Sequence, residues 1–354
     1  MKTLQHNGFT RAGGAFAAMM AALVVAGACS AAPEADSSTA VTVGISGAVS
    51  DAPFYLADAL GYFKQENLDV ELKNFASSSD MIAPLGTGDL QVGASGPTAA
   101  LYNAIERGVK VRIVADKGRV LPKTSFEAIL VDKRLFDSGT VKSMKDLKGK
   151  VVADYAESST TSAFLNAGLE GAGLTLKDIK RTYLTGSQHL AALQNGSVVA
   201  SVTPEPFATA AVDSGFAVRL PESDTIYPDQ QTSVVLFGER FGQESAAQRF
   251  MKAYLQGARA FNDAIGADGK LTGPKADEVI RILSERASTP AETLRKIVVN
   301  GVSPDGELNM SSLQRDLDFF KAGGWLTNPS MTLQDSVNPS FAQRAAQELG
   351  PYQG

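Results

Sequence analysis

Residues 41–63 read VTVGISGAVSDAPFYLADALGYF, and this stretch decides the fold class. Apolar residues at 41, 43 and 45 alternate with small or polar ones, which predicts a strand. Small and polar residues follow, and Pro53 then opens a helix, because proline is well tolerated in a first helical turn. The helix carries its apolar residues on one side, at Phe54, Ala57, Leu60 and Phe63. The fold therefore begins with a strand, a loop of small residues and a helix.

The same order of elements recurs along the chain. Alternating strands and helices at this spacing predict an α/β fold with mainly parallel strands and crossover helices. Strands are expected at 70–72, 91–93, 111–114, 150–154, 198–202 and 217–220, and helices at 97–107, 158–171, 187–195, 204–214, 244–265, 275–286, 290–299 and 311–321.

Two further strands, 128–131 (AILV) and 233–237 (SVVLF), are too apolar for the edge of a sheet. We interpret them as the places where the chain passes out to a second lobe and back. Lobe 1 is then expected to comprise 41–127 plus 233–354, and lobe 2 to comprise 128–232. Ligands of such folds bind outside the carboxyl ends of the parallel strands, so the loops of both lobes are expected to face one cleft.

The first 28 residues have the composition of a secretion signal. Lys2 and Arg11 precede the uncharged run GGAFAAMMAALVVAGA at 13–28, which is short for a membrane span and ends in small residues. The junction VAGACS at 25–30 resembles the bacterial lipoprotein box, so Cys29 is expected to be acylated. Ordinary cleavage that leaves a free thiol is the alternative. A flexible tether is expected at 29–40, and the mature chain carries a charge of -5 - 2 = -7.

The composition excludes several classes of protein. One cysteine permits no intramolecular disulfide, and with only two histidines there is no Cys/His zinc site, so no metal and no cofactor are expected. The acidic balance argues against a nucleic-acid partner. The sequence contains no G-x-S-x-G, Walker A or H-E-x-x-H motif, which favours a protein that is not an enzyme. Glycosidase-type carboxylate pairs stay open, because they depend on geometry.

Four loops that precede helices are rich in Ser, Thr and Gly, at 46–50, 77–79, 95–98 and 158–161. Helix starts and hydroxyls together offer enough donors to hold an oxyanion without Arg or Lys. The same residues are the commonest N-caps, so each loop alone is better explained as a cap than as a ligand contact, and only the four together point to an anion.

Five other side chains allow more than one interpretation. Glu205 stands between two prolines and is either aimed at the cleft or simply favourable at a helix start. Asp116 and Lys117 either enter the cleft or form a solvated pair. His189 and Trp325 are expected to be packing residues.

Several segments together resemble the periplasmic substrate-binding proteins of ABC transporters, in the nitrate/sulfonate/taurine and thiamine-precursor group. They are APFYLA at 52–57, GYF at 61–63, GDLQVG at 88–93, NAI at 103–105, RGV at 107–109, VAD at 114–116, KDLKGK at 145–150 and EP at 205–206. The resemblance covers roughly 40–250, and the sequence departs from the family pattern at Pro84 and Gln91.

The resemblance implies a two-lobed periplasmic-binding-protein fold that closes on a small-molecule ligand and docks on an ABC permease with its ATPase. The protein is then expected to be a monomer in the periplasm or at the cell surface, tethered to the membrane by its lipid. The ligand stays open between a sulfonate, a pyrimidine or flavin-type compound and an aromatic acid. The expected ligand-binding residues are Ser50, Asp51, Ala52, Phe54, Ser78, Ser95, Gly96, Tyr155, Ser158, Ser159, Thr160 and Glu205.

Two alternatives remain at this point. The same fold is shared by the fungal enzyme that builds the thiamine pyrimidine from its own histidine, and a binding protein can also report its ligand to a sensor.

Overall fold

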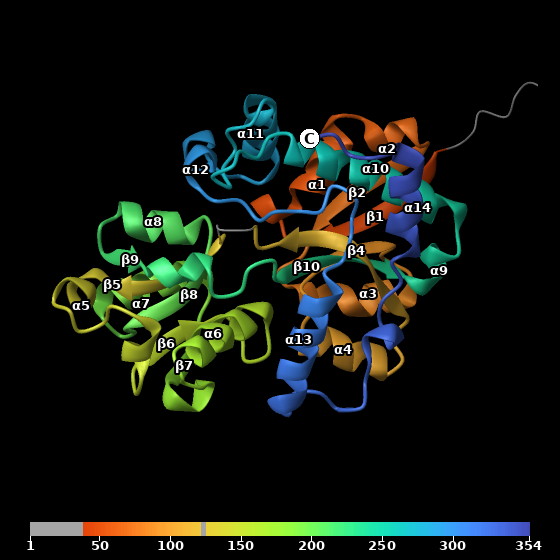
Figure 1. Ribbon diagram of the computed structural model, residues 1–354. Coiled ribbons are helices and arrows are strands. Elements are labelled where there is room, and N and C mark those ends of the chain that lie inside the picture. Colours follow the sequence, from red (N-terminus) through yellow and green to blue (C-terminus); the bar gives the residue numbers. More distant parts are fainter. Residues whose placement is uncertain (1–37, 122–124) are drawn as a thin grey trace, which may run out of the picture. The chain divides into compact units, whose positions relative to one another are not determined.

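The structure is a computed structural model that describes residues 38–121 and 125–354 (Figure 1). The expected signal peptide, Cys29 and nearly all of the expected tether lie outside the described residues. The chain divides into two units, 1–37 and 38–354, and the second unit contains every element discussed below.

The first sheet, sheet A, has five strands in the order β2-β1-β3-β10-β4. Strands β1, β2 and β3 run parallel, and β10 lies antiparallel between β3 and β4. Four of the five strands therefore share one direction. The strands are β1 (Thr39–Ile45), β2 (Leu68–Asn74), β3 (Val92–Ser95), β4 (Val111–Arg119) and β10 (Gln231–Gly238).

Helices cover both faces of sheet A because its strands are apolar on both sides. In β10, Val235 and Phe237 belong to one hydrophobic cluster, whereas Val234 and Leu236 belong to another. The first cluster includes α1 (Ala52–Ala59), α10 (Ser245–Asn262), α11 (Ala276–Arg286) and α14 (Ser340–Leu349). The second includes α3 (Ile82–Thr87), α4 (Ala99–Glu106) and α13 (Met310–Ala322).

The helix expected from Pro53 onward is interrupted. It ends as α1 at Ala59 and resumes as α2 (Tyr62–Gln65), because Gly61 adopts a φ of 76° that lies outside the right-handed helical region. Phe63 is still buried on the same side as the first half of the helix. Its ring stacks on that of Phe250 in α10, at 5.1 Å between ring centroids. The apolar spacing in the sequence therefore predicts the buried side correctly, while the backbone turns between the two halves.

The second sheet, sheet B, repeats this plan with the order β7-β6-β8-β5-β9. Strand β5 lies antiparallel between β8 and β9, as β10 does in sheet A. The strands are β5 (Glu127–Asp132), β6 (Val151–Asp154), β7 (Lys180–Tyr183), β8 (Ala200–Pro204) and β9 (Ala217–Arg219), and the helices are α5 (Lys133–Asp137), α6 (Thr160–Gly171), α7 (Gly186–Asn195) and α8 (Phe207–Asp213).

The predicted fold class, two mainly parallel sheets flanked by helices, is confirmed. The two apolar strands differ from expectation in one respect, because β5 belongs wholly to sheet B and β10 wholly to sheet A. The chain passes between the sheets in the segments that precede them. The lobe boundaries themselves stay a prediction.

Several elements differ from the sequence expectation. The sequence does not predict strand β7, because the exposed edge strand KRTY has no apolar alternation. Nor does it predict helix α14, because this alanine-rich helix is weakly apolar. The helix expected at 204–214 begins only at Phe207, since Pro204 still pairs within sheet B. The helix expected at 290–299 is shorter, as α12 (Ala291–Lys296), and a short helix α9 (Glu239–Gly242) precedes α10.

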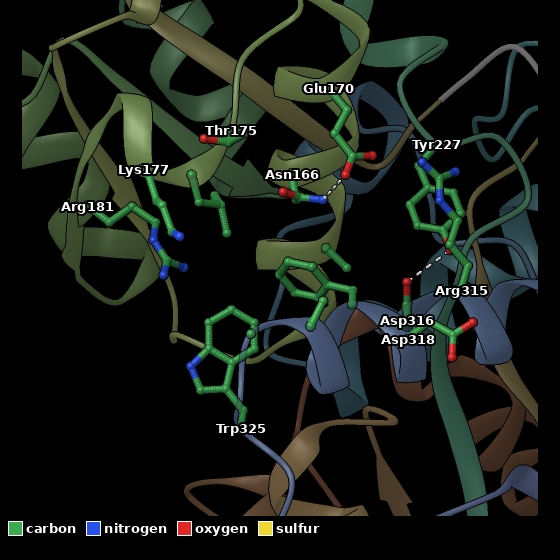
Figure 2. Close-up of a pocket in the computed structure, with 15 residues that line it drawn as sticks. Asn166, Glu170, Thr175, Lys177, Arg181, Tyr227, Arg315, Asp316, Asp318 and Trp325 are labelled. Atoms are coloured by element: carbon green, nitrogen blue, oxygen red, sulfur yellow. Dashed lines mark hydrogen bonds between the residues drawn. The ribbon is translucent and has the colours of Figure 1, made fainter. Parts of the chain in front are cut away.

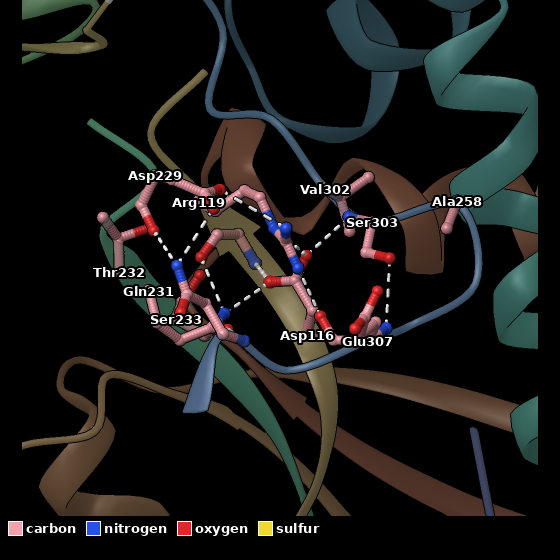
Figure 3. Close-up of polar contacts among 12 residues, drawn as sticks. Asp116, Arg119, Asp229, Gln231, Thr232, Ser233, Ala258, Val302, Ser303 and Glu307 are labelled. Atoms are coloured by element: carbon pink, nitrogen blue, oxygen red, sulfur yellow. Dashed lines mark hydrogen bonds and ion pairs between the residues drawn. The ribbon is translucent and has the colours of Figure 1, made fainter. Parts of the chain in front are cut away.

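Asp116 joins β4 to the segment 300–307 and to the start of β10 (Figure 3). The side chain is fully buried, and one carboxylate oxygen accepts hydrogen bonds from Gly118 N at 2.7 Å and Gln231 Nε2 at 2.5 Å. The other oxygen accepts from Ser303 N at 2.5 Å and lies 3.3 Å from Arg119 Nε. Asp116 is therefore neither solvated nor free to enter a cleft.

We expect Asp116→Asn to lower the free energy of unfolding by about 2–4 kcal/mol, because an amide nitrogen cannot accept the hydrogen bonds that one carboxylate oxygen now receives. Urea denaturation measures the change. Asp69→Asn, at an exposed position of β2, is the matched control and should stay within about 0.5 kcal/mol of wild type. A loss at Asp116 no larger than at Asp69 would contradict the anchoring role.

Candidate ligand-binding site

Asp51 organises the loop that follows β1. Its carboxylate is fully buried, and one oxygen accepts hydrogen bonds from Ser46 N at 3.0 Å, Ser46 Oγ at 2.7 Å and Ala48 N at 3.2 Å. Lys117 Nζ lies 2.6 Å from the other oxygen and also donates to Ser50 Oγ at 3.2 Å. The interpretation of Lys117 as part of a solvated pair is wrong, because the residue is only 5% exposed. The pair fixes the loop against β4.

The start of α4, after β3 of sheet A, contacts the loop that leads from β6 of sheet B into α6. Thr98 caps α4 and Ser159 caps α6, each with its side-chain oxygen. The backbone N–H of Ala99, the first residue of α4, donates to the carbonyl of Ser158 at 3.3 Å. A donor at one helix start therefore already faces the loop at the other.

A second buried carboxylate, Asp154, lies beneath the start of α6. It accepts hydrogen bonds from Tyr155 N at 2.7 Å, Thr161 Oγ1 at 2.8 Å and Ser162 Oγ at 2.6 Å, and Arg181 Nη1 is 3.7 Å away. Burial raises the pKa of Asp154 above its usual range, and these donors partly oppose that effect. Donors of the protein itself therefore already use the hydrogen-bonding capacity of the Asp154 carboxylate.

The segment between β9 and β10 ties α13 to the start of α6. Gln230 is fully buried, and its Nε2 donates to the carbonyl of Thr160 at 3.0 Å and to Asp316 Oδ2 at 3.4 Å. Tyr227 donates its hydroxyl to Asp316 Oδ1 at 2.9 Å. Burial is the main cause that raises the pKa of Asp316 to about 7.

The sequence interpretation did not name Gln230 or Asp316. A signal existed for Asp316, which occupies an apolar position of α13 together with Leu313, Leu317 and Phe320. A carboxylate at such a position is buried and needs partners. Gln230 lies in a polar turn and offers no comparable signal.

Most of the expected site residues lie in the loops at the carboxyl ends of the parallel strands. Ser50 and Asp51 follow β1, Ser95 and Gly96 join β3 to α4, and the group Ser158, Ser159 and Thr160 joins β6 to α6. Ser78 lies half-buried in a short 3-10 turn after β2, and Tyr155 is half-buried with its ring edge-on to His189 at 4.8 Å between centroids.

Two expected site residues belong to the core instead. Ala52 and Phe54 are fully buried in α1, and the Phe54 ring lies 4.8 Å from that of Tyr254. Their spacing on the apolar side of the helix accounts for this placement, so we assign them a packing role.

Glu205 lies in a different groove from the Ser/Thr loops. Its Oε2 accepts the N–H of Thr209 at 2.9 Å, inside α8, and Oε1 is 3.9 Å from Arg219. The groove has a volume of about 430 Å³ and is also lined by Lys270 and Lys296. Burial is the main cause that raises the pKa of Glu205. The Glu205 carboxylate therefore stabilises α8, the helix that follows it, by accepting a backbone hydrogen bond.

Beside the Ser/Thr loops, α6 and α13 line a cavity of about 700 Å³ (Figure 2). Trp325 lies in its wall and packs on Phe319 at 5.1 Å between ring centroids, which agrees with the expected packing role. Lys177 and Arg181 lie near Trp325, whereas Arg315, Asp316 and Tyr227 lie at the other end. Among the described residues, no group of three or more His, Cys, Asp and Glu side chains is arranged to hold a metal ion.

The model of one protein family, described as NMT1/THI5 like, matches residues 49–263. This range is more than half of the chain. The protein belongs to the NMT1/THI5-like family. The matched range includes most of the loop after β1, the loops after β3 and β6, every strand of sheet B, and the whole of α10.

The curated relatives of this chain include a binding protein and an enzyme. The chain is 29% identical over 221 residues to an aliphatic sulfonates-binding protein of Escherichia coli, covering 62% of this chain and 63% of the relative. It is 32% identical over 111 residues to a 4-amino-5-hydroxymethyl-2-methylpyrimidine phosphate synthase of Aspergillus parasiticus, covering 30% and 29% respectively. The chain thus spans less than two thirds of the length of either relative.

Solved structures show the same fold. The periplasmic aliphatic sulphonate binding protein SsuA of Escherichia coli matches with a TM-score of 0.65 at 21% identity, over 85% of this chain and 92% of its own. The alkanesulfonate-binding protein SsuA of Xanthomonas axonopodis pv. citri, bound to MOPS, matches with a TM-score of 0.62 at 20% identity, over 84% and 98%. The fold is thus that of periplasmic binding proteins.

We expect Glu205→Ala to lower the free energy of unfolding by about 1 kcal/mol through loss of the hydrogen bond to Thr209 N, and to leave ligand affinity within twofold of wild type. Denaturant melts and calorimetric titration measure the two effects. A tenfold loss of affinity at unchanged stability would restore the ligand role that the sequence suggested for Glu205.

Proposed function

We propose that this protein is an extracytoplasmic solute-binding protein that captures a small organic anion between its two sheets and delivers it to an ABC permease. Sulfonates are the first candidates, because the relative with the longest matched segment described above is named for them. One observation carries the proposal: the N–H of Ala99, at the start of α4, donates to the Ser158 carbonyl in the loop before α6, so the Ser/Thr loop that follows β3 contacts the one that follows β6.

The chemistry of this place suits an anion. The first N–H groups of a helix have no partner within the helix and lie at the positive end of its dipole. At α4, Thr98 satisfies one such group and the Ser158 carbonyl accepts from Ala99. In the proposed complex, a ligand oxygen replaces that carbonyl. Lys117 is paired with Asp51 and adds little net charge, so backbone and hydroxyl donors supply most of the binding.

The ligand can be sought in a thermal-shift panel of sulfonates, pyrimidines, flavins and aromatic acids. A ligand at 100 times its Kd adds about 2.7 kcal/mol to the free energy of unfolding. Any ligand found in this way serves in the titrations below. If no sulfonate and no other organic anion shifts the melting temperature, the proposed function is wrong.

We expect Ala99→Pro to weaken binding of the anionic ligand about tenfold or more, because proline removes the N–H that faces the Ser158 loop. The fold should tolerate the change, since proline is favoured at a first helical position and Thr98 has the extended ψ of 162° that a residue before proline requires. Isothermal titration calorimetry measures the affinity.

Ser245→Pro is the matched control for this variant. Ser245 is the exposed first residue of α10, and Glu244 before it has an extended ψ of 146°. The control should bind the ligand like wild type. If both proline variants bind the ligand with equal affinity, the Ala99 N–H is not part of the binding site.

The proposal includes a lipid anchor on Cys29. In the part of the chain that the structure describes, no helix is long and apolar enough to cross a membrane. We expect cells supplied with an alkyne-tagged fatty acid to label the wild-type protein and the control Ser30→Ala, whereas Cys29→Ser stays unlabelled. Intact mass spectrometry that finds an unmodified Cys29, or a mature chain that begins elsewhere, would contradict the anchor.

An enzyme of the pyrimidine synthase type is the second candidate, because the chain is 32% identical to a fungal synthase over 111 residues. Two features argue against it. His189 is fully buried, with Nδ1 3.1 Å from Thr203 Oγ1 and Nε2 3.1 Å from the Leu184 carbonyl. Burial also lowers the pKa of His189. Turnover by the purified protein without a permease would favour the enzyme. If the protein reports its ligand to a sensor instead of a permease, it is a receptor.

A further inference from the structure

The cavity of about 700 Å³ between α6 and α13 has no part in the function proposed above (Figure 2). None of the ligand-binding residues expected from the sequence lines it, and all of those residues are described by the structure. Its wall on α6 consists of Ala163, Asn166 and Glu170, whose spacing places them on one face of the helix. Asn166 and Glu170 lie about 9 and 15 Å along the helix from its first residue, Thr160. The cavity is therefore separate from the Ser/Thr loops.

Helices that pack on different sheets form the walls of this cavity. Phe164 of α6 belongs to a hydrophobic cluster of sheet B, whereas Leu317 of α13 belongs to one of sheet A. Phe319 of α13 packs against both clusters. An occupant of the cavity would therefore contact well-anchored elements on two sides. The volume lies in the range of pockets that hold drug-sized molecules.

One end of the cavity offers an aromatic surface. Trp325 and Phe319 both line it, and each ring is half-buried, so part of its surface stays open to an occupant. The short side chains of Ala163 and Ala322 complete this part of the wall. Aromatic rings favour offset or edge-on contact with other rings. A flat ring is thus the group that fits this end best.

The acids that line the cavity already have hydrogen-bond donors. Glu170 Oε1 accepts from Asn166 Nδ2 at 2.9 Å. Asp318 Oδ1 accepts from Gln314 Nε2, also at 2.9 Å. Asp316 is buried and accepts from a hydroxyl and an amide, as described above. These carboxyl groups therefore have little need of a donor from a ligand.

The cations of the cavity differ in what they already bind. Arg181 is 3.7 Å from Asp154, and its guanidinium carbon lies 5.9 Å from the centroid of the Trp325 ring. Arg315 lies over the Tyr227 ring at the other end. Lys177 is exposed near Trp325 and forms no ion pair within 38–121 and 125–354. Its ammonium is therefore available to the acid group of a ligand whose ring contacts Trp325.

We propose that this cavity is a second binding site, which takes an aromatic acid. The ring of the ligand packs on Trp325 and Phe319, and its acid group pairs with Lys177. The site goes beyond the proposed function, because it uses none of the residues assigned to that function. It also selects differently, since it requires a ring as well as a negative charge.

Three probes with the same number of heavy atoms separate the effect of the charge from that of the ring. 4-tert-Butylbenzoate has both features, 4-tert-butylbenzamide lacks the charge, and 4-tert-butylcyclohexane-1-carboxylate lacks the aromatic ring. By calorimetry we expect the benzoate to bind about threefold or more tightly than the amide, as an exposed ion pair allows. We expect a similar advantage over the cyclohexane compound, as aromatic packing allows.

Tryptophan fluorescence gives a second readout. Trp325 is the single tryptophan of the chain, so a change in tryptophan emission reports on this residue alone. We expect the benzoate to change the emission with the same saturation curve that calorimetry gives. Binding of the benzoate without any change in emission would overturn the second site.

Two variants should each abolish one preference and keep the other. Lys177→Gln should bring the ratio of benzoate to amide affinity close to one and keep the preference for the ring. Trp325→Leu, followed by calorimetry, should lower the ratio of benzoate to cyclohexane affinity towards one and keep the preference for charge. A general loss of structure would weaken all three probes alike, so the two ratios test the contacts themselves.

Lys180→Gln is the matched control for Lys177→Gln. Lys180 is an exposed residue of β7 that does not line the cavity, and its replacement should leave both ratios at their wild-type values. A charge preference that survives in Lys177→Gln, or one that Lys180→Gln reduces as much, would overturn the assignment of Lys177.

The outcomes separate this inference from the proposed function. Ala99→Pro should bind the benzoate like wild type, and Lys177→Gln should keep wild-type affinity for the ligand found in the thermal-shift panel. If Ala99→Pro no longer binds the benzoate, the probe occupies the Ser/Thr loops, which overturns the second site while the proposed function stands. If the panel contains no ligand for the loops, the proposed function is wrong, and the benzoate ratios still decide whether the cavity is a site.

Discussion

Asp51 and Lys117 bring opposite charges to 2.6 Å in a place where both side chains are almost fully buried. Either charge alone would be unfavourable there by several kcal/mol, so each requires the other. Because Asp51 also gathers three donors from its own loop, the pair fixes the backbone after β1. The preceding residue of β4, Asp116, binds the segment 300–307. Two consecutive residues therefore position both the loop after β1 and the segment 300–307 on sheet A.

Sheet B shows how environment gives similar carboxyl groups different roles. Asp154 receives one hydrogen bond from Tyr155 N and two from the first turn of α6, at Thr161 and Ser162, and the latter two hold that turn in place. Glu127, on the same face, has an unpartnered oxygen and a pKa raised to about 8. The first group is an internal anchor, whereas the second keeps unused hydrogen-bonding capacity.

The sequence predicts those features that depend on local periodicity. The alternation at 41–45 and the apolar spacing at 53–63 predict β1 and the buried side of α1, and Ser or Thr before a helix predicts its cap. What it does not predict depends on contacts between distant residues. Glu205 has the surroundings of a site residue in the sequence, yet its carboxylate binds its own helix. The roles of Asp316 and Gln230 become apparent only from the fold, in which α13 and the segment before β10 both contact the start of α6.

Strand β10 lies between β3 and β4, although more than a hundred residues separate it from β4 in the chain. Until residues 231–238 arrive, β3 and β4 cannot belong to one sheet, and each presents an unpaired strand edge. A chain that emerges from its amino end therefore cannot complete sheet A before about two thirds of it has been made. Contacts so distant in sequence form slowly, which prolongs the interval in which the polypeptide remains unfolded.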